Sequence, residues 1–448
     1  MPTRRLAMPA RRLALAIAAL AGLARVGSAQ SSFVLSLGDA ARLAARQSAS
    51  VQMALARADQ ADARTTQRRA DLLPHLSAMA TEGERTFNAA SFGLSFPGAP
   101  FPAGGAALGP VRNYDLRARA SVTLLDLGAW QRSRSAHSAA DAARADAANT
   151  ADIAANLGAF AYLRSLRAEA FLRARSADSV LADELVGIAR EQVRSGVGIG
   201  LDLTRAQAQA AAVRAQLIGA RGENDRARLD LHRALGLPLD ARVVLKDSLA
   251  VRDNTPLPFH QDAVAQAVKA RPDLAAAVAQ IEAQRQSLQA ARADRLPTVA
   301  LAADQGANGV STDRMLNTWS WGVQVSIPLF DGFRREGRLA EQSAALKELE
   351  ARDRDLRQLV TIEVRGALLD VHSTRELSDA ADTRLRLAEQ ELAEARDRFR
   401  AGVAGNADVV TASLQLNAAR TQQVDALTQL RAARVALARV MGAVTRLP

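Results

Sequence analysis

The stretch REQVRSGVGIGLDLTRAQAQ, residues 190–209, recurs without a gap as RDRFRAGVAGNADVVTASLQ, residues 396–415. The two copies share a Gly-Val pair, an Asp that follows it and a later Gln, set in a background rich in Ala and Arg. A composition rich in Ala and Arg would by itself rarely place Gly and Asp at the same positions in both copies. The match therefore indicates an internal repeat, which has to be recognised before any single motif is interpreted.

A second gapless match extends the repeat toward the N-terminus of each copy. Residues 39–74 align with 262–297, and their clearest part is RADLLP at 69–74 against RADRLP at 292–297. Both matches occur in the same order along the chain. The sequence therefore predicts two tandem copies of one unit, residues 30–236 and residues 262–448, joined by a Pro-containing linker or equatorial element at 237–261.

Each copy begins with a predicted helix, over about 39–73 and 262–295, that runs into Pro74 or Pro297, since proline cannot continue a helix. Two alternating segments follow in each copy and predict strands at about 75–86, 114–125, 298–306 and 318–329. A strand of a soluble sandwich is the alternative, but four strands in an otherwise helical chain cannot make a sandwich alone. Strands with one apolar face and one Arg, Ser, Thr or Gln face suit a barrel between lipid and water. An interfacial aromatic belt is expected from three residues near the strand ends: Tyr114, Trp319 and Trp321.

Two long proline-free stretches, 129–194 and 333–400, predict very long helices, each about 100 Å at 1.5 Å per residue. Their apolar positions step by three and four residues, which is the spacing of a coiled-coil seam. Turns are expected at 195–202 and 401–408, and each leads into a return helix that ends near Gly236 or Gly442.

The N-terminus, residues 1–29, is typical of a secretory signal peptide. Four Arg precede an apolar run at Leu13–Ala24, and small residues then precede an expected cut before Gln30. The run is shorter than the roughly 20 residues that a spanning helix needs. This segment has five Arg and no acid, so it supplies five of the eleven net positive charges. The other charges are interspersed along helical stretches, and no basic block indicates nucleic-acid binding.

The sequence offers no catalytic constellation, so we expect no enzyme, no cofactor and no metal site. It contains no Cys, which excludes disulfides, thiolate ligands and a lipid-modified N-terminal Cys. The five His are scattered without metal-ligand spacing. The Gly-rich run at 196–200 resembles a phosphate loop, but helices are expected on both sides of it, whereas such a loop follows a strand.

Taken in order, these motifs resemble those of TolC-type outer-membrane efflux proteins, over nearly the whole chain after the signal segment. The resemblance is carried by Leu-Pro at 73–74 and 296–297, by IPLFDG at 327–332, and by the two Gly-Val turns with their Asp. It implies a mostly helical fold with a transmembrane β-barrel contribution. Three copies would share one 12-stranded barrel and a periplasmic α-helical tunnel.

The resemblance also implies partners and site residues. The chain would lie in the outer membrane of a Gram-negative bacterium with a large periplasmic portion, as the channel of a tripartite efflux or type I secretion system. A periplasmic adaptor (membrane fusion) protein and an inner-membrane pump would be its partners, and the adaptor would dock at the two turns, Gly196, Val197, Gly402 and Val403. The periplasmic gate would involve Asp202, Phe399 and Asp408.

The gate residues depart from the family pattern in ways that matter for closure. A second acid of the family is Thr411 here, and the latch Arg and Tyr are replaced by Ala404 and Phe399. We therefore expect a mouth closed more by apolar packing of Phe399, with Asp202 lacking its cation. Alternatively, Asp202 and Asp408 only cap their return helices. The alternative function is a periplasmic coiled-coil structural or adaptor protein, and the sequence does not identify the cargo.

Overall fold

The structure, a computed structural model, describes residues 33–88, 107–249, 256–401, 403 and 405–447. The expected signal peptide and its cut before Gln30 therefore lie outside the described residues. The first copy of the repeat contains β1 (Phe33–Leu35), α2 (Leu37–Gln47), α3 (Ala49–Ala70), β2 (His75–Asn88), β3 (Ala107–Leu125), α4 (Leu127–Arg194) and α5 (Gly200–Leu235).

The second copy repeats this order after the short strand β4 (Val243–Leu245). Its elements are α6 (His260–Ala270), α7 (Pro272–Ala293), β5 (Thr298–Gly309), β6 (Leu316–Ser326), α8 (Arg334–Arg400), α9 (Asn406–Val440) and the 3-10 turn η2 (Val444–Arg446). The predicted tandem order of helix, two strands, long helix and return helix is confirmed.

The four long strands form one antiparallel sheet in the order β2-β3-β5-β6. The hairpins of the two copies join through β3 and β5, where Val122 lies opposite Leu301. β5 in turn places Leu301 opposite Val323 and Ala303 opposite Trp321. Since side chains alternate between the two faces of a strand, the apolar residues of both copies share one face of the sheet.

The other face of the sheet carries a polar network that crosses three strands. The Arg117 guanidinium on β3 is bonded to Asp304 on β5, and it also donates to Thr318 on β6 at 3.2 Å. The Ser320 hydroxyl donates to the same Asp304 at 2.5 Å. The sheet therefore has the one apolar and one polar face that its sequence predicts.

The strand ends differ from the prediction. β3 begins at Ala107 instead of 114, and β6 ends at Ser326 instead of 329, because Pro328 has no N–H to donate to a ladder. The β3–β5 register shifts between Thr123 and Leu125, so a bulge at Leu124 interrupts the alternation. Alternation alone does not mark such a bulge.

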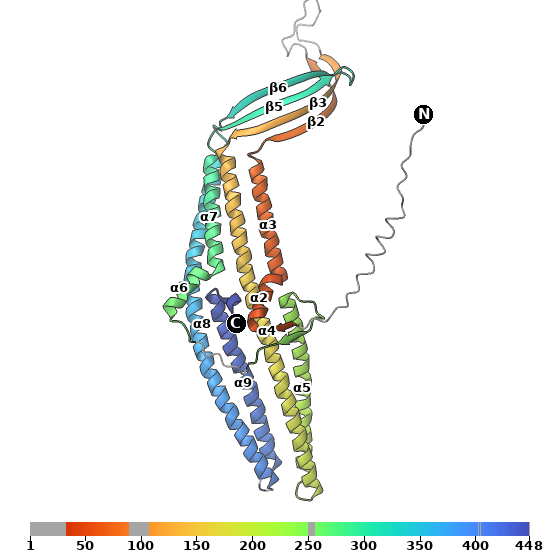
Figure 1. Cartoon of the computed structure of the whole chain (residues 1–448), viewed down its shortest axis with the longest axis vertical. Helices are drawn as coiled ribbons and strands as arrows, with labels where there is room; N and C mark the ends of the chain where they lie inside the picture. Colours follow the sequence, from red (N-terminus) through yellow and green to blue (C-terminus); the bar gives the residue numbers. More distant parts are fainter. Residues whose placement is uncertain (1–32, 89–106, 250–255, 402, 404, 448) are drawn as a thin grey trace, which may run out of the picture.

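The helices α4 and α8 run unbroken for 68 and 67 residues. Figure 1 shows both descending from the sheet, with α3 and α7 beside their upper halves and α5 and α9 beside their lower halves. None of the helices in the described part of the chain combines the length and the apolarity needed to cross a membrane.

The single helices predicted over 39–73 and 262–295 are wrong, because each is two helices. In the second copy Arg271 is extended (φ −73°, ψ 125°), since the ring of Pro272 disfavours a helical residue before it. In the first copy Ser48 takes the corresponding extended conformation (φ −60°, ψ 145°) without any proline. Ser48 is the N-cap of α3, a position at which Ser is common, but a lone Ser is too weak a signal to place the break.

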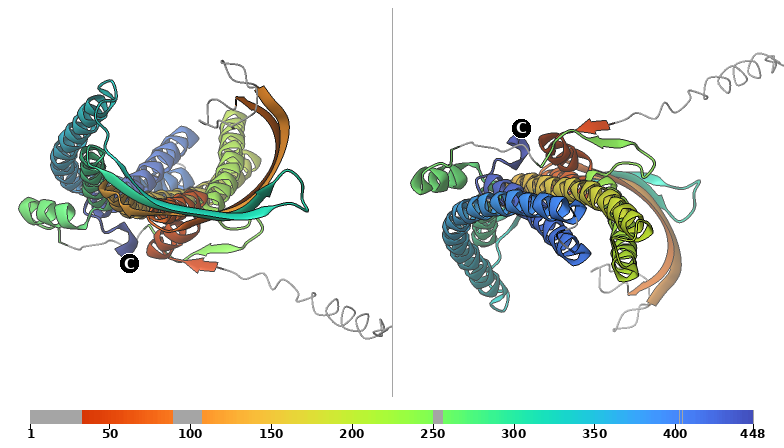
Figure 2. Two further views of the ribbon diagram at one scale, coloured as in Figure 1. Left: turned by 90° about the horizontal axis from the view of Figure 1, so that it is seen from above. Right: turned by 90° about the horizontal axis from the view of Figure 1, so that it is seen from below.

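An equatorial layer surrounds these breaks. The short strands β1 and β4 pair in parallel there, and the buried Tyr162 of α4 donates to the Leu35 carbonyl at 3.0 Å and to Asp247 at 2.9 Å. Figure 2 shows the sheet strongly curved, with α6, β1 and the C-terminus on its convex side and the lower helix ends beneath its concave side. The concave side therefore faces the axis of any closed assembly.

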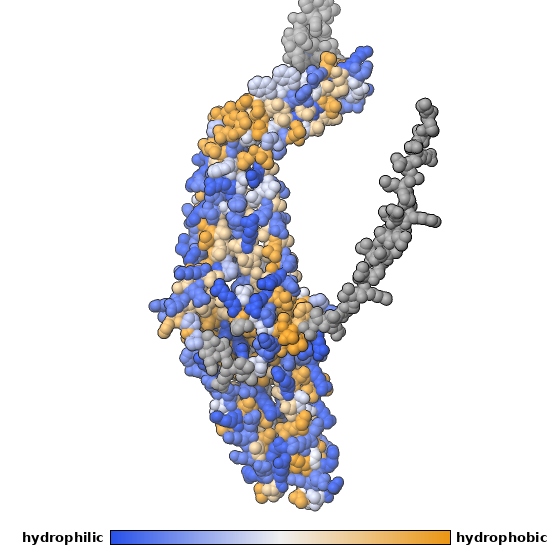
Figure 3. Space-filling model, in the orientation of Figure 1, coloured by the Kyte–Doolittle hydropathy of each residue, from blue (hydrophilic) through white to orange (hydrophobic). Residues whose placement is uncertain are grey.

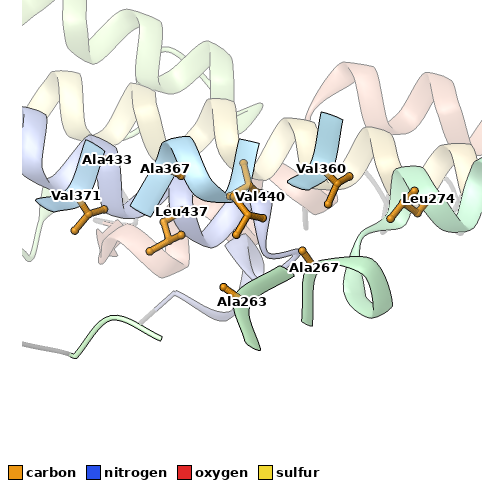
Figure 4. Close-up of a cluster of buried hydrophobic side chains, with 10 residues drawn as sticks. Ala263, Ala267, Leu274, Val360, Ala367, Val371, Ala433, Leu437 and Val440 are labelled. Carbon is orange, nitrogen blue, oxygen red and sulfur yellow. The ribbon is translucent and has the colours of Figure 1, made fainter. Parts of the chain in front are cut away.

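The core is built largely from small side chains. One cluster, shown in Figure 4, joins α6, α7, α8 and α9 through Ala263, Ala267, Leu274, Val360, Val364, Ala367, Val371, Ala433, Leu437 and Val440. Between α2 and α4 the approach is closer still: a Cβ added at Gly158 would lie 3.0 Å from the Ala40 carbonyl oxygen and collide with the Ala44 methyl. Small residues therefore set the distance between the helices.

Gly158→Ala is expected to lower the stability of the protein, although Gly→Ala in a helix interior ordinarily gains about 1 kcal/mol. The added methyl overpacks the α2–α4 contact, which costs about 1–3 kcal/mol. Gly187→Ala on the same helix is the matched control, because a Cβ there meets nothing within 4 Å. Thermal unfolding should show a lower Tm for the first variant and an unchanged or higher Tm for the second, and equal shifts would contradict the close approach.

Candidate functional site

The candidate site is the lower end of the molecule, where α4 turns into α5 and α8 turns into α9. After α4, Gly196 has a left-handed backbone (φ +79°), a conformation that glycine adopts without a steric penalty. The N–H groups of Val197 and Gly198 both donate to the Gln192 carbonyl, at 3.1 and 2.9 Å. The turn closes the helix end with its own backbone, so it is a helix cap and not a phosphate loop.

The tips of both turns are apolar and exposed. The side chains of Val197 and Val403 are 73% and 70% exposed, and Ile199 and Leu201 add to the first tip. Gly402 and Ala404 lie outside the described residues. Exposed valines at the very end of a helical hairpin offer apolar contact area to another surface.

The two acids of the candidate gate stand at equivalent places. Asp202 lies in the first turn of α5, and Asp408 lies in the first turn of α9. The N-cap residues of these helices are Ile199 and Gly405, and neither makes a capping hydrogen bond through a side chain. Neither acid bonds an N-cap backbone group through its side chain, but both lie, as the alternative interpretation predicts, at the start of a return helix, where a carboxylate faces the positive end of the helix dipole. Asp202 does have a cation, Arg205 at 3.8 Å, whereas Asp408 is exposed and has no ion pair within the described part of the chain.

Phe399 is 3% exposed and belongs to an apolar cluster at the lower end of the molecule. The cluster joins α4, α8 and α9 through Leu181, Leu185, Ala388, Leu392, Phe399, Val409, Ala412, Leu416 and Ala419. The Phe399 ring therefore packs the α4–α5 hairpin against the α8–α9 hairpin within one chain.

Three polar contacts between the two hairpins surround this cluster. The Gln192 amide donates to the Phe399 carbonyl at 3.1 Å, and the buried Asn406 amide donates to the Asp202 carbonyl at 2.8 Å. Glu184 accepts from Arg396 and, at 3.3 Å, from Arg400. Sequence reasoning missed these contacts. In the first two the acceptor is a backbone carbonyl, which leaves no residue signature, and the Glu184 pairs join residues more than 200 positions apart.

A buried charge lies farther up the same interface. The Asp178 carboxylate of α4 is fully buried and accepts from Arg175 at 3.0 Å and from Arg420 of α9 at 2.7 Å. With the Asn417 amide oriented so that its nitrogen faces the carboxylate, it donates to both oxygens of Asp178, at 2.7 and 3.0 Å. A buried carboxylate needs such complete pairing, since an unpaired one is costly.

The three residues of the candidate aromatic belt differ in exposure: the two Trp are exposed, and Tyr114 is half-buried. Trp319 and Trp321 project from the apolar face of β6 and are mostly exposed. Tyr114 lies well inside β3 and not near its end, because the strand begins at Ala107, and its hydroxyl donates to Glu82 at 2.9 Å.

No group of three or more acids or histidines in the described residues could hold a metal ion. A groove of about 800 Å³ lies between α3, α4, α7 and α8. Charged side chains line it, among them Arg57, Arg64 and Asp146.

The family described as "Outer membrane efflux protein" matches residues 40–237 and 263–443. The chain is 28% identical over 299 residues to Protein CyaE of Bordetella pertussis, covering 64% of this chain and 61% of that protein. It is 28% identical over 224 residues to Alkaline protease secretion protein AprF of Pseudomonas aeruginosa, covering 47% and 44%. The chain thus spans less than two thirds of the length of these curated relatives.

Solved structures show the same fold at low identity. A membrane protein from Pseudomonas aeruginosa superposes with a TM-score of 0.76 at 21% identity, over 91% of this chain and 93% of that one. The Campylobacter jejuni CmeC outer membrane channel gives a TM-score of 0.77 at 16% identity, over 91% and 85%.

Asn406→Ala is expected to loosen the contact between the hairpins without unfolding them. Losing one hydrogen bond of about 1 kcal/mol should speed amide exchange at the start of α5 about five-fold. Thr411→Ala is the control, since its hydroxyl bonds only the Ala407 carbonyl of its own helix. Hydrogen-exchange mass spectrometry distinguishes them, and equal protection of residues 200–203 in both variants would show that the Asn406 contact contributes nothing.

Proposed function

The chain belongs to the outer membrane efflux protein family, and from this premise we propose that three copies of it form one channel from the periplasm to the exterior. As a member of that family it is an outer-membrane protein and not an enzyme. The observation that carries the proposal is the combination, in one chain, of a two-faced four-stranded sheet with helices about 100 Å long. The alternative of a periplasmic adaptor does not fit a family match that runs over both repeats.

The trimer follows from the edges of the sheet. β2 and β6 are the outer strands, and each is paired on one side only within the described residues. Unpaired backbone groups are prohibitive in lipid, so β6 of one copy has to pair with β2 of the next. Three curved sheets joined in this way give twelve strands, with the apolar face outward and the concave side around the axis. The two repeats, 30–236 and 262–448, and their linker 237–261 are the proposed units of each subunit.

The proposed protein partners bind at the lower end of the molecule, where the helical hairpins turn. The turns Gly196-Val197 and Gly402-Val403 dock a periplasmic adaptor, which connects the channel to an inner-membrane pump. The exposed valines support this, because apolar tips in water are otherwise unfavourable. At the membrane, Tyr114, Trp319 and Trp321 are proposed to form the aromatic belt.

The proposed gate combines the acids and the apolar cluster. Asp408 contributes one carboxylate per copy to a ring around the mouth, and Asp202 contributes to the contacts between hairpins. Phe399 holds the two hairpins of each copy together. Of the two gate acids, Asp408 is the exposed one for which the described residues show no ion pair, so it is the one available to a passing cation.

We propose that the pump belongs to one of two classes. The first exports drugs or ions, and the second is a type I secretion system. Secretion of a polypeptide is the second candidate because one relative is named for protease secretion. Both classes need the same passive conduit.

The channel proposal is tested with the purified protein in planar bilayers. We expect a detergent-stable trimer that conducts ions, with Asp408→Asn reducing cation selectivity because a ring of carboxylates is removed. Asp202→Asn is the matched control and should barely change conductance. A protein that stays monomeric without detergent and conducts nothing would overturn the channel, whereas unchanged selectivity in the Asp408 variant would overturn only the acidic ring.

Docking is tested by photocrosslinking from position 197 in cells. We expect covalent capture of the adaptor of an inner-membrane pump, identified by mass spectrometry. Val403→Glu should lower this capture and leave the trimer yield unchanged, since a charge in an apolar contact is costly. Val310→Glu, in the loop between β5 and β6, is the control and should not affect capture. Undiminished crosslinking in the Val403 variant argues against docking at these tips.

A further inference from the structure

Both junctions between a strand and a long helix carry exposed apolar side chains, which we call the collar. It consists of Leu125, Leu127 and Trp130 in the first copy and of Leu329, Phe330 and Phe333 in the second. The second group is the more exposed, at 89%, 74% and 70%. Figure 3 shows hydrophobic residues gathered where the sheet meets the helices. The two copies of the repeat therefore present the same kind of surface at the same place.

The second group is held rigidly. Phe333 has a left-handed backbone (φ +62°), the one positive φ outside glycine in the described part of the chain. This conformation costs about 1–2 kcal/mol for a residue with a side chain. The ring meets Phe330 edge-to-face at 5.5 Å, and the nearly buried Arg335 fixes the loop through Asp331 at 3.0 Å and the Pro328 carbonyl at 2.9 Å. Two phenylalanines are thus fixed in an exposed position at a conformational cost.

A neighbouring copy cannot cover the first group. The helices stand side by side in the order α3, α4, α7 and α8, and the strands in the order β2, β3, β5 and β6. The β3–α4 junction therefore lies inside one copy, away from the edges at which copies meet. Its apolar side chains, Trp130 above all, are left to face either lipid or water.

A free cation accompanies each group. The Arg134 guanidinium lies 4.9 Å from the centre of the Trp130 ring, and Arg334 directly follows Phe333. Both are exposed, and neither has an ion pair within the residues that the structure describes. Aromatic rings beside unpaired Arg match the boundary between acyl chains and phosphate headgroups.

We propose that the collar binds anionic phospholipid of the periplasmic leaflet, with the rings at the level of the headgroups and Arg134 and Arg334 on lipid phosphates. The proposal rests on the channel function. The collar continues the apolar face of the sheet toward the helices. It places the periplasmic boundary of the membrane at the strand–helix junctions.

The first arm of the test measures the depth of Trp130. Trp319→Phe/Trp321→Phe leaves Trp130 as the single Trp of the full chain. In vesicles of phosphatidylcholine with phosphatidylglycerol, its fluorescence should be quenched more strongly by lipid brominated near the headgroup than near the chain ends. Trp130→Phe is the control, because any quenching that persists in this variant comes from Trp319 and Trp321 of the sheet and not from the collar. A Trp130 that no brominated lipid quenches would overturn the collar.

The second arm measures the effect of lipid charge. Phosphatidylglycerol, added to the detergent-solubilised trimer, should raise its Tm by roughly 2–4 °C over the same amount of phosphatidylcholine. Arg134→Gln/Arg334→Gln should abolish this difference, and Arg190→Gln, an exposed Arg near the lower end of α4, should preserve it. An equal rise in all three proteins would overturn the phosphate contacts.

Phe333→Asn separates loss of lipid contact from loss of folding. Asn tolerates a left-handed backbone better than Phe, so the trimer in pure detergent should be at least as stable as the original. In lipid vesicles the same variant should lose part of the stabilisation. If the trimer conducts but Trp130 stays unquenched, the collar alone fails, whereas a protein that never inserts refutes both the collar and the channel.

Discussion

The backbone groups at the two open edges of the sheet constrain everything else in this molecule. A four-stranded sheet ends in β2 and β6, and their outward N–H and C=O groups need partners wherever water is absent. The proposed closure by three copies of the same chain would satisfy them. The curvature of the sheet and its single apolar face agree with closure around an axis on the concave side. The helices continue the strands, so the same symmetry extends to them.

Close helix packing is the second constraint, and small side chains meet it. Each return helix ends in a left-handed glycine, Gly236 or Gly442, against the end of the short helix of its own copy. A Cβ would lie 2.7 Å from the Gln47 carbonyl oxygen at the first and 2.7 Å from the Ala270 carbonyl oxygen at the second. The Ala-rich composition with 4% aromatics serves the same purpose, because alanine lets long helices lie close over their whole length.

The polar contacts between the hairpins differ in strength along the interface. The ion pairs of Glu184 are partly exposed to solvent, and pairs of this kind contribute about 0–1 kcal/mol each. The Asp178 carboxylate is fully buried among Arg175, Arg420 and Asn417, and removing one partner of a buried pair costs about 3–5 kcal/mol. The hairpins are thus fixed firmly well above their tips and joined weakly at the tips. This gradient agrees with the gate that is proposed for the lower end.

The sequence by itself determined the tandem repeat, the two-faced strands and the long helices, because periodicity and proline are local signals that each segment carries alone. It also marked the Gly-Val turns, since glycine is needed where the chain reverses. The break at Ser48, the bulge at Leu124 and the strand β1 were decided by the tertiary structure, as neighbouring elements override weak local preferences there. The same holds for the contacts of Asn406 and Gln192, whose acceptors are backbone carbonyls of a segment some 200 residues away. Any residue can offer a carbonyl, so only packing decides which one is reached.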